Sequence, residues 1–364
     1  MSKISRKTDG ISRRDFLKTG LVGSSALLAA CIPQLAGCAT RNRPVVSIAE
    51  NTDSQAVVEE AIDLLGGMGT ILAGKQKIML KPNLVGDNPR CTTSPKVIEA
   101  LAQLMLAEGK EVLIGEGSAM AAGYNSLADG SPCYTDDPAL LDAMQQHVFD
   151  SLEYTQMAAS LGVPLVNLHT GPMVTVNVPG GGLAYQQLKL HQSLTQIDLL
   201  CSVPMMKTHD RAVVSLGMKN LIGLYPGSVY GTVRASVHDH ATAAGSPGIA
   251  YETIDMVRAN KLGLTVVDGL IAMEGNGPAN GDLVPMYLII AGTNPLATDM
   301  VAANVMGFEP DEVPTFDCAI SIGMQPQSLA EIEVRGKRIQ DVQRKFKRPT
   351  MNPWTIGEYD QCAP

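Results

Sequence analysis

Aromatic residues are scarce in this 364-residue sequence: they make up 4% of the chain, and Trp354 is the single tryptophan. The hydrophobic content is nevertheless 45%, so the core must be built from aliphatic side chains. Charged residues are also few, at 18%. This composition is typical of a globular protein, and the length suggests one large or two moderate domains.

Several motifs that would identify a function are absent. The seven cysteines include no C-x-x-C pair, which argues against a ferredoxin-type iron–sulfur motif and a zinc ribbon. There is no G-x-S-x-G nucleophile elbow, so nucleophilic hydrolysis has little support. Cys201 lies in an apolar run and is expected to be a buried thiol, whereas Cys91 and Cys133 could form a disulfide after export.

Basic residues are sparse once the N-terminal segment is set apart. Residues 1–37 hold six basic and two acidic residues, and the rest of the chain has 22 Lys and Arg against 34 Asp and Glu, a net charge of −12. Such an acidic body is a poor nucleic-acid binder, because phosphate contacts need clustered Lys and Arg. The short basic run from Arg344 to Arg348 is better explained as a solvated face.

The N-terminal segment carries an export pattern. Residues 12–18 match the twin-arginine pattern S-R-R-x-F-L-K, and the apolar stretch 20–30 is shorter than a membrane span of ~20 residues. Residues 35–38 resemble a lipoprotein box ending at Cys38, and Cys31 ends a competing match. We therefore expect residues 1–38 to be a twin-arginine signal peptide with a lipobox. A plain export signal with incidental cysteines is the alternative.

The expected location follows from this signal. The twin-arginine translocase would carry the folded chain across the inner membrane to the periplasmic or cell-surface side. Acyl chains on Cys38 would then attach the protein to a membrane, since each buried CH₂ contributes ~0.8 kcal/mol. Residues 39–44 would form a tether between the lipidated cysteine and the folded domain.

Short apolar runs alternate with helical patterns from residue 45 onward, which predicts one α/β domain over residues 45–340. The expected sheet is mostly parallel with helices on both faces, and an inserted β-hairpin is expected at 172–190. Residues 341–364 are expected to be an irregular tail. Strands are expected at 45–49, 78–80, 111–115, 164–168, 197–203, 262–267, 286–291 and 331–334, and helices at 56–65, 94–108, 138–148, 153–161, 213–224, 248–260 and 294–306.

Polar side chains directly follow most of these strands. The residues are Lys81, Asn83, Glu116, Lys207, His209, Asp268 and Asn294. Ligands of open α/β sheets bind beyond the carboxyl ends of the strands, so parallel strands would bring these groups into one crevice. The alternative is that loops are simply polar, which explains Asp and Asn well. It explains less well two lysines that are each held between a buried strand and a turn.

The residue types suggest how such a crevice would bind a small anion. The expected catalytic residues are Lys81, Glu116, Lys207, His209 and Asp268, with the lysines holding the anion and His209 transferring protons or binding a metal. For Lys207 a structural salt bridge is also open. The expected substrate-binding residues lie in the same loops and in Gly-rich segments, and they are Asn83, Ser118, Lys219, Asn220, Glu274 and Asn276.

A divalent metal is a further candidate cofactor. His209, His238, His240 and Asp299 could form a mixed nitrogen and oxygen site, which suits zinc, iron, manganese or nickel. His238 and His240 are two residues apart, so they would share one side of an extended segment. A surface loop with two solvated histidines is the alternative.

The short motifs of the central region occur together in a known order. They are Lys81-Pro82-Asn83, Thr93-Ser94-Pro95, Gly115 to Ser118, Val203 to His209, Leu216 to Gly223, Asp268-Gly269, Met273 to Pro278 and Gly292 to Asp299. In this order the chain resembles the family catalogued as domain of unknown function 362 across residues 78–308. The resemblance implies an α/β domain without an agreed activity. Some relatives carry appended ferredoxin modules, and the family often has a lysine where this chain has Met205.

We therefore expect an exported α/β enzyme that acts on a small anionic substrate, with a divalent metal as a candidate cofactor. The alternative is a non-catalytic lipoprotein that binds a ligand or metal and assists an envelope redox system.

Overall fold

The computed structural model describes residues 43–127, 132–234, 237 and 249–350. Several features predicted from the sequence lie outside these residues and stay predictions. They are the signal peptide, the lipidation candidates Cys31 and Cys38, most of the tether, His238, His240, and the end of the tail from residue 351.

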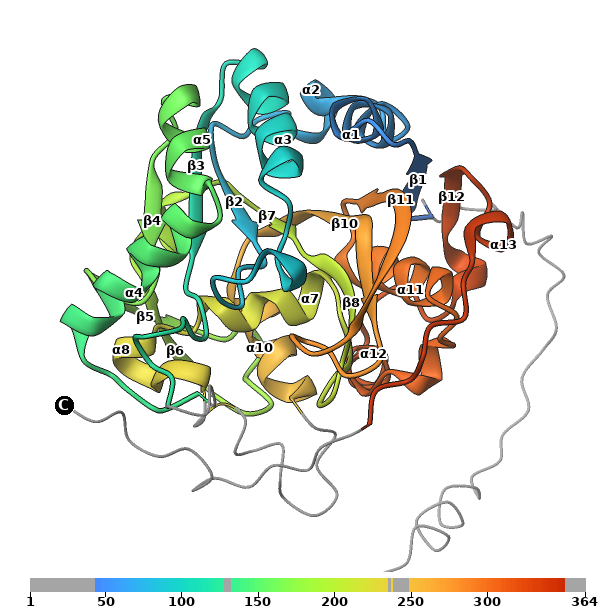
Figure 1. The fold of residues 1–364 in the computed structure, drawn as a ribbon. Helices are drawn as coiled ribbons and strands as arrows, with labels where there is room; N and C mark the ends of the chain where they lie inside the picture. The colour runs from blue at the N-terminus through green and yellow to red at the C-terminus, as the bar shows by residue number, and fades with distance from the viewer. Residues whose placement is uncertain (1–42, 128–131, 235–236, 238–248, 351–364) are drawn as a thin grey trace, which may run out of the picture. The chain divides into compact units, whose positions relative to one another are not determined.

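The described residues form a ten-stranded sheet flanked by helices (Figure 1). Its strands are β1 Val45–Glu50, β2 Lys77–Pro82, β3 Glu111–Glu116, β4 Leu165–Asn167, β7 Leu199–Val203, β8 Met205–His209, β9 Val213–Ser215, β10 Leu262–Glu274, β11 Asp282–Gly292 and β12 Glu333–Gly336. The main path runs β12-β1-β11-β10-β7-β2-β3-β4, and β8 pairs with β10 and β9.

The sheet is mostly parallel, as predicted. The strands from β10 through β7, β2 and β3 to β4 all pair in parallel, which sets their carboxyl ends along one edge. One prediction about this edge is wrong. Because β11 runs antiparallel to both β10 and β1, Asn294 at its end lies at the opposite edge. There its side chain caps the next helix by accepting a hydrogen bond from Ala297 N.

Helices cover both faces of the sheet, which also confirms the predicted fold class. Successive residues of β2 point to opposite faces: Ile78 and Leu80 pack into one hydrophobic cluster, and Met79 packs into the other. The first cluster includes α1 Ser54–Asp63, α3 Pro95–Ala107, α4 Pro138–Ser151 and α5 Tyr154–Leu161. The second includes α7 Gly217–Asn220, α10 Ala250–Ala259, α11 Pro295–Val305 and α12 Pro314–Ser321.

Shorter elements complete the described chain. The remaining helices are α2 Met68–Ile71, α6 Ser193–Gln196, α8 Gly227–Tyr230 and α13 Ile339–Val342. The 3₁₀ helices are η1 Pro89–Cys91, η2 Leu221–Leu224, η3 Thr232–Arg234, η5 Pro310–Glu312 and η6 Leu329–Glu331. The predicted hairpin is present as the antiparallel pair β5 Met173–Asn177 and β6 Gln187–His191.

Two stretches near the sheet edge differ from the sequence prediction. The segment after β7 was expected to be a loop, but it forms β8, because β10 is long enough to pair with β7 in its first half and β8 in its second. The predicted helix over 213–224 is instead β9, α7 and η2. As a result Lys207, His209 and Asp268 sit on strands, and α7 presents Lys219 and Asn220.

The cysteines follow the sequence prediction in part. Cys201 is fully buried in β7, as expected. Cys133 is disulfide-bonded but Cys91 is a free thiol, so the suggested bridge between these two does not form. In the part of the chain that the structure describes, none of the helices has the length and hydrophobicity of a membrane span.

Candidate functional site

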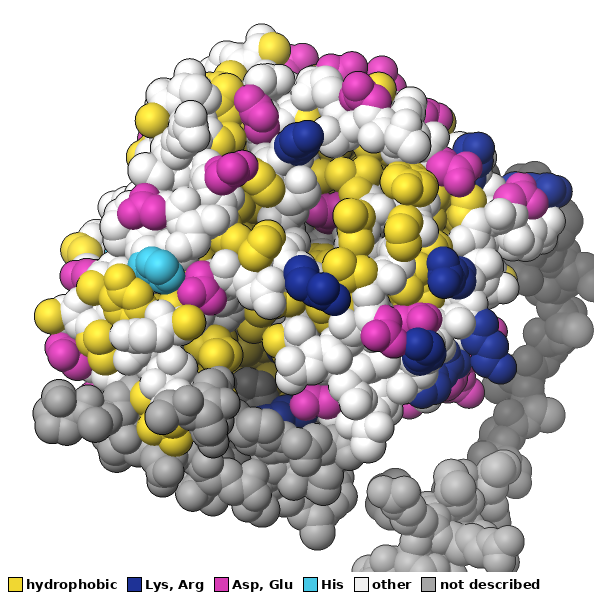
Figure 2. All heavy atoms as spheres, in the orientation of Figure 1, with side chains coloured by type: hydrophobic (Ala, Val, Ile, Leu, Met, Phe, Trp, Pro, Cys, Tyr) yellow, Lys and Arg dark blue, Asp and Glu magenta, His cyan; other side chains and the backbone are white. Residues whose placement is uncertain are grey.

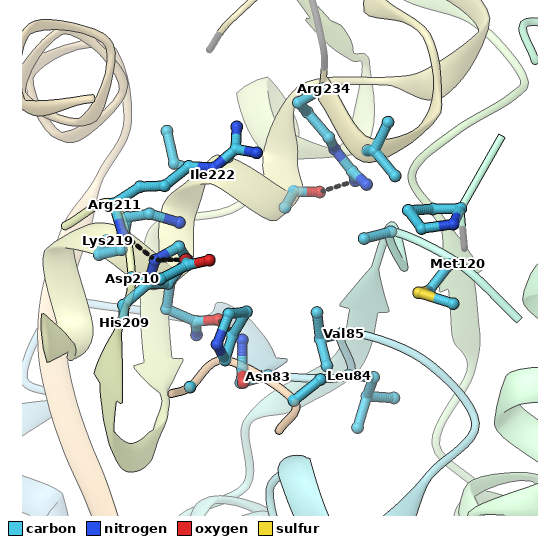
Figure 3. A pocket seen from close by; sticks show the side chains of 18 of the residues that line it. Asn83, Leu84, Val85, Met120, His209, Asp210, Arg211, Lys219, Ile222 and Arg234 are labelled. Carbon is cyan, nitrogen blue, oxygen red and sulfur yellow. Dashed lines mark hydrogen bonds and ion pairs between the residues drawn. The ribbon is translucent and has the colours of Figure 1, made fainter. Parts of the chain in front are cut away.

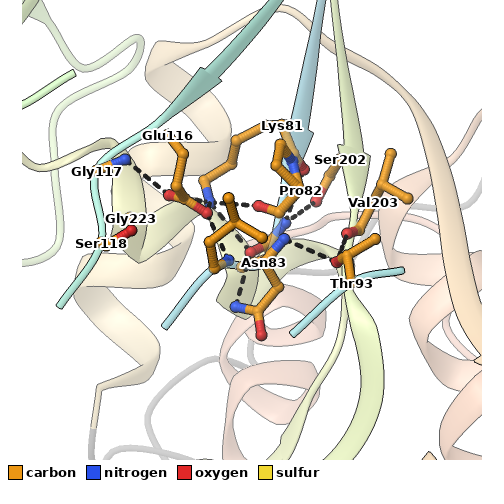
Figure 4. A network of polar contacts seen from close by, with 12 residues as sticks. Lys81, Pro82, Asn83, Thr93, Glu116, Gly117, Ser118, Ser202, Val203 and Gly223 are labelled. Atoms are coloured by element: carbon orange, nitrogen blue, oxygen red, sulfur yellow. Dashed lines mark hydrogen bonds and ion pairs between the residues drawn. The ribbon is translucent and has the colours of Figure 1, made fainter. Parts of the chain in front are cut away.

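A buried ion pair lies at the carboxyl ends of two neighbouring strands (Figure 4). Lys81 on β2 and Glu116 on β3 are 1% and 2% exposed, and Lys81 Nζ lies 2.8 Å from Glu116 Oε1 and 2.9 Å from Oε2. The parallel pairing of β2 and β3 brings the carboxyl ends of the two strands together, and these residues lie at those ends. The predicted convergence of the two residues is therefore found in the structure.

The polar atoms of this pair are fully used. Glu116 accepts hydrogen bonds from the backbone N–H groups of Leu84 and Gly117, both at 2.8 Å. Lys81 Nζ also donates to Pro82 O at 2.8 Å. Burial lowers the pKa of Lys81, while the Glu116 charge opposes that shift. Because Lys81 has no spare donor, it acts as a fixed cation rather than as an exchanging base.

Gly223 has to be a glycine because of this pair. A Cβ atom at this position would lie 2.6 Å from Glu116 Oε1 and 2.7 Å from Lys81 Nζ. Any side chain here would displace the charged atoms. The glycine in the Leu216-to-Gly223 motif therefore has a packing role that depends on residues far away in the sequence.

Asn220 joins the ion pair to the neighbouring strand ends. Its Oδ1 accepts from Lys81 Nζ and from Asn83 Nδ2, both at 3.1 Å. Its Nδ2 donates to Lys81 O and to Ser202 Oγ, also at 3.1 Å. Within the part of the chain that the structure describes, Asn83 Oδ1 is buried without a hydrogen-bond partner. That oxygen is an acceptor available to a ligand in the adjoining cavity.

A cavity of about 270 Å³ opens beside this network. Figure 3 shows His209, Asp210 and Lys219 on one side of it and Leu84, Val85 and Met120 on the other. Seven of the residues predicted from the sequence line the cavity, and they are Lys81, Asn83, Glu116, His209, Lys219, Asn220 and Asn276. The sequence did not suggest three further charged residues that line it, Asp210, Arg211 and Arg234.

Lys219 lines the same cavity as Lys81 but is not paired with a carboxylate among the described residues. Its side chain lines the cavity from α7, and among the described residues its Nζ makes no hydrogen bond or ion pair. Burial and the nearby Lys207 lower the pKa of Lys219 to about 7, although Asp210 opposes the shift. Near neutral pH this amine therefore exists in both its charged and neutral forms.

His209 is neutral at the cavity wall. Its side chain is 6% exposed, and burial together with the Lys219 charge lowers its pKa to about 3. Its Nδ1 accepts a hydrogen bond from Arg211 N at 3.1 Å, so the ring proton is on Nε2. Asp210 Oδ1 lies 3.2 Å from the same Nδ1. Because the imidazole ring is uncharged and its Nδ1 already accepts a hydrogen bond from Arg211 N, the contact between His209 and Asp210 is not an ion pair.

Arg234 closes another part of the cavity wall. Its guanidinium donates to the backbone carbonyls of Ser118, at 2.9 Å, Gly117 and Gly223, the last at 3.2 Å. Val233 and Arg234 both have positive φ, a backbone conformation that is costly for residues other than glycine. Burial lowers the pKa of Arg234 to about 10, so it stays charged. Nothing in the local sequence identifies this arginine.

Other predicted site residues lie outside the cavity lining. Lys207 is fully buried in β8, and its Nζ donates to Cys91 O at 2.6 Å. Burial lowers its pKa to about 8. Ser118 contributes through its backbone, because its carbonyl accepts from Arg234. Glu274 accepts from the backbone N–H of Lys347 at 3.0 Å.

Asp268 belongs to a second cavity rather than to the first. The expectation that it would share a crevice with Lys81 is therefore wrong in detail, although both lie near the same sheet edge. The segment from Asn83 to Pro95 lies between the two residues: its first residues line the first cavity, and its later residues line the second.

Asp299 has a structural role in this arrangement. Its two carboxylate oxygens accept from Gly217 N and Met218 N, both at 2.8 Å, which ties α11 to the first turn of α7. Within the described residues no group of three or more His, Cys, Asp and Glu side chains could hold a metal ion. The metal site predicted with His209 includes two histidines outside those residues, so it stays a prediction.

Comparisons with known proteins add the family. The chain is 27% identical over 274 residues to a thylakoid-associated protein of Synechocystis sp., covering 74% of this chain and 75% of that one. The lactate racemase apoprotein of Thermoanaerobacterium thermosaccharolyticum superposes with a TM-score of 0.41 at 12% identity, over 69% of this chain and 54% of the racemase. Residues 78–304 match the family described as "Domain of unknown function (DUF362)", and the chain therefore belongs to that family.

Proposed function

We propose that the chain is an enzyme acting on a small anionic substrate bound in the cavity beside the Lys81–Glu116 pair. The observation that carries this proposal is the amine of Lys219, which lines that cavity and makes no hydrogen bond or ion pair among the described residues. It sits with two arginines, Arg211 and Arg234, in the wall of a cavity whose own carboxylates are Glu116 and Asp210. Since Lys81 and Glu116 neutralise each other, the described lining has more positive than negative charge.

The local charge matters because the chain as a whole is acidic, with a net charge of −8. A cluster of cations in such a protein creates a field of limited extent that favours anions only at the cavity. Low exposure strengthens that interaction, because charges attract more strongly where water is excluded. A cavity of about 270 Å³ suits a small molecule rather than a polymer.

Lys219 is the proposed acid–base group, and His209 is a proposed hydrogen-bond donor to the substrate. An amine with a pKa of about 7 can both accept and donate a proton near neutral pH, which is the condition for efficient general acid–base catalysis. His209 Nε2–H would donate a hydrogen bond to the bound anion. The Lys81–Glu116 pair, tied to Asn220, would form a fixed wall of the site, and Asn83 Oδ1 would accept from a substrate hydroxyl.

Anion binding can be measured on the purified full-length chain. Isothermal titration with phosphate, sulfate, acetate and succinate should show binding of at least one anion. Lys219→Met should weaken that binding at least about tenfold, because a hydrogen bond to a charged group contributes roughly 1.5–3 kcal/mol. The matched control is Lys96→Met, which removes an exposed lysine of α3.

Two results would contradict the proposal. One is the absence of binding by any of these anions. The other is an equal affinity of the Lys219→Met and Lys96→Met proteins, which would show that the cavity amine does not contact the anion. The non-catalytic alternative would keep the binding and lack turnover of every bound anion.

The proposal also includes export and membrane attachment. The twin-arginine pattern at residues 12–18 and the lipobox at Cys38 support it, and a relative whose name places it at thylakoid membranes is consistent with a membrane-linked location. The twin-arginine translocase would be the export partner. Folding before export suits a site assembled from residues as distant as Lys81 and Asn276.

A further inference from the structure

The second cavity has a volume of about 540 Å³. Buried residues form its floor, and exposed residues form its rim. Pro89, Arg90, Ser151, Glu153 and Ile271 are exposed at the rim. Thr92, Thr93, Leu152, Met205 and Asp268 are buried at the floor. Hydrophobic side chains gather over β10 and β11, the strands that form one wall (Figure 2).

The floor carries one fixed carboxylate. Asp268 is 3% exposed, and its Oδ2 accepts from Ser94 N at 2.8 Å at the first turn of α3. Its Oδ1 accepts from Leu270 N at 3.1 Å. Burial raises the pKa of Asp268 to about 6, although the hydrogen bonds from Ser94 N and Leu270 N oppose that shift, so the group is mostly ionised at neutral pH. Since Asp268 already occupies the anion position at that helix end, a second anion there would be repelled.

Acceptors other than Asp268 also line this cavity. Ser94 is the N-cap residue of α3, but its side chain makes no capping hydrogen bond, contrary to the usual role of serine there. The Thr92 hydroxyl makes no hydrogen bond among the residues described. A carboxylate has about four lone-pair sites, and the two backbone bonds leave some of them available.

The remaining walls are apolar. Leu270 and Leu283 line the space between floor and rim, and Leu152 and Met205 add apolar surface at the floor itself. A ligand that matches both parts must have an apolar body and a terminal group with several donors and positive charge. A primary ammonium has three N–H donors and no acceptor, which fits one carboxylate and two hydroxyl groups.

We propose that this second cavity binds a primary amine with an apolar body, whose ammonium group pairs with Asp268. The assignment is independent of the anion site, because the two cavities share no described lining residue. A failure of this proposal would therefore leave the proposed enzyme function unaffected.

The probes are three molecules of similar size that differ in the end group: 2-phenylethylamine, 2-phenylethanol and 3-phenylpropionate. Isothermal titration of the full-length chain should show the amine binding at least about tenfold more tightly than the alcohol, with the carboxylate weakest. Asp268→Asn keeps the shape of the side chain and should reduce amine binding to the level of the alcohol. Thermal unfolding of the variant reports whether it is folded.

A second pair of variants avoids the buried position. Ile271 is 49% exposed at the rim, so its replacement should leave the fold intact. Ile271→Lys should weaken amine binding severalfold, and Ile271→Glu should strengthen it. Lys219→Met should leave amine binding unchanged, since it alters only the first cavity.

Several results would overturn the proposal. They are equal affinities for the amine and the alcohol, failure of all three probes to bind, unchanged amine binding in a folded Asp268→Asn protein, and the same effect from both Ile271 variants. Loss of amine binding in Lys219→Met would place the amine in the first cavity and would equally refute the assignment.

Discussion

At the scale of single residues, the first cavity holds two lysines in opposite situations. Lys81 is tied to Glu116 and Asn220, and its charge is compensated inside the protein. Lys219 has no hydrogen bond or ion pair among the described residues, and it lies near other cations. Lys81 thus has a structural role in the site, whereas Lys219 can contact a ligand.

The titration of Lys219 predicts how anion affinity depends on pH. The protonated amine attracts the anion, so affinity should fall by about tenfold as pH rises from about 6 to about 8.5, through the lowered pKa of about 7. Sulfate is the suitable ligand, because its charge is constant over this range. The charged groups near the amine are Lys207, Asp210, Arg211 and Arg234.

Lys219→Arg provides the control for this pH dependence. A guanidinium stays protonated in this range, so the variant should bind sulfate with nearly the same affinity at both ends of it. Equal pH dependence in the wild type and in Lys219→Arg would show that another group is responsible.

Breaking the Lys81–Glu116 pair should cost far more stability than breaking the exposed pair between Lys77 and Glu111 of the same two strands. Glu116→Gln leaves Lys81 buried without its counter-charge and should lower the free energy of unfolding by about 3–5 kcal/mol. Glu111→Gln, at the other end of β3, breaks the exposed contact with Lys77 and should cost about 0–1 kcal/mol. Urea denaturation of both variants measures the difference in their free energies of unfolding. Similar losses of stability in both would contradict the role given to the buried pair.

At the scale of elements, α7 is a short helix that carries Lys219 and Asn220 and is held from behind by α11. Asp299 on α11 accepts two hydrogen bonds from the first residues of α7 and does not line the anion cavity. A helix of four residues has little stability of its own, so its position depends on this contact. Asp299 is therefore a positioning residue for the site.

Replacing Asp299 should disturb the site without touching it. Asp299→Asn can accept only one of the two backbone bonds through its single oxygen, and it should lower the free energy of unfolding by about 1–3 kcal/mol and weaken anion binding. Asp317→Asn, at an exposed position of α12, is the matched control. Hydrogen exchange at residues 217–220 should rise in Asp299→Asn alone. Unchanged exchange there would show that other contacts hold α7.

Local sequence predicts some of these elements well and others poorly. The start of α3 at Ser94-Pro95 and the strands ending at Lys81 and Glu116 follow from turn residues and apolar runs, which are local signals. The antiparallel direction of β11 depends on contacts with distant strands, so the sequence predicts the wrong edge of the sheet for Asn294. Arg234 donates to the carbonyls of Gly117 and Ser118, which lie more than a hundred residues away in the sequence. No sequence pattern near Arg234 predicts these contacts.

At the scale of the whole molecule, one acidic chain has two cavities of contrasting charge on either side of residues 83–95. The first is lined by Lys219 and two arginines, and the second has Asp268 at its floor. Net charge therefore says little about which ligands bind, since the local arrangement of charges decides it. Both cavities form only when distant parts of the chain have come together.

The proposed export by the twin-arginine route would meet that requirement, because this route carries folded proteins. The double variant Arg13→Lys/Arg14→Lys should block export, so that the uncleaved chain accumulates in the cytoplasm. Cell fractionation and immunoblotting measure this distribution. Arg6→Lys makes the same kind of change outside the pattern and should leave export unchanged. A wild-type distribution of the double variant would refute twin-arginine export.

The two lipobox candidates make a second matched pair. If Cys38 is the acylated residue, Cys38→Ala should still be exported but should leave the membrane fraction, because the acyl chains supply the attachment at ~0.8 kcal/mol per buried CH₂. Cys31→Ala should stay at the membrane. The reverse pattern would assign the lipid to Cys31, and retention of both variants at the membrane would show that attachment does not depend on either cysteine.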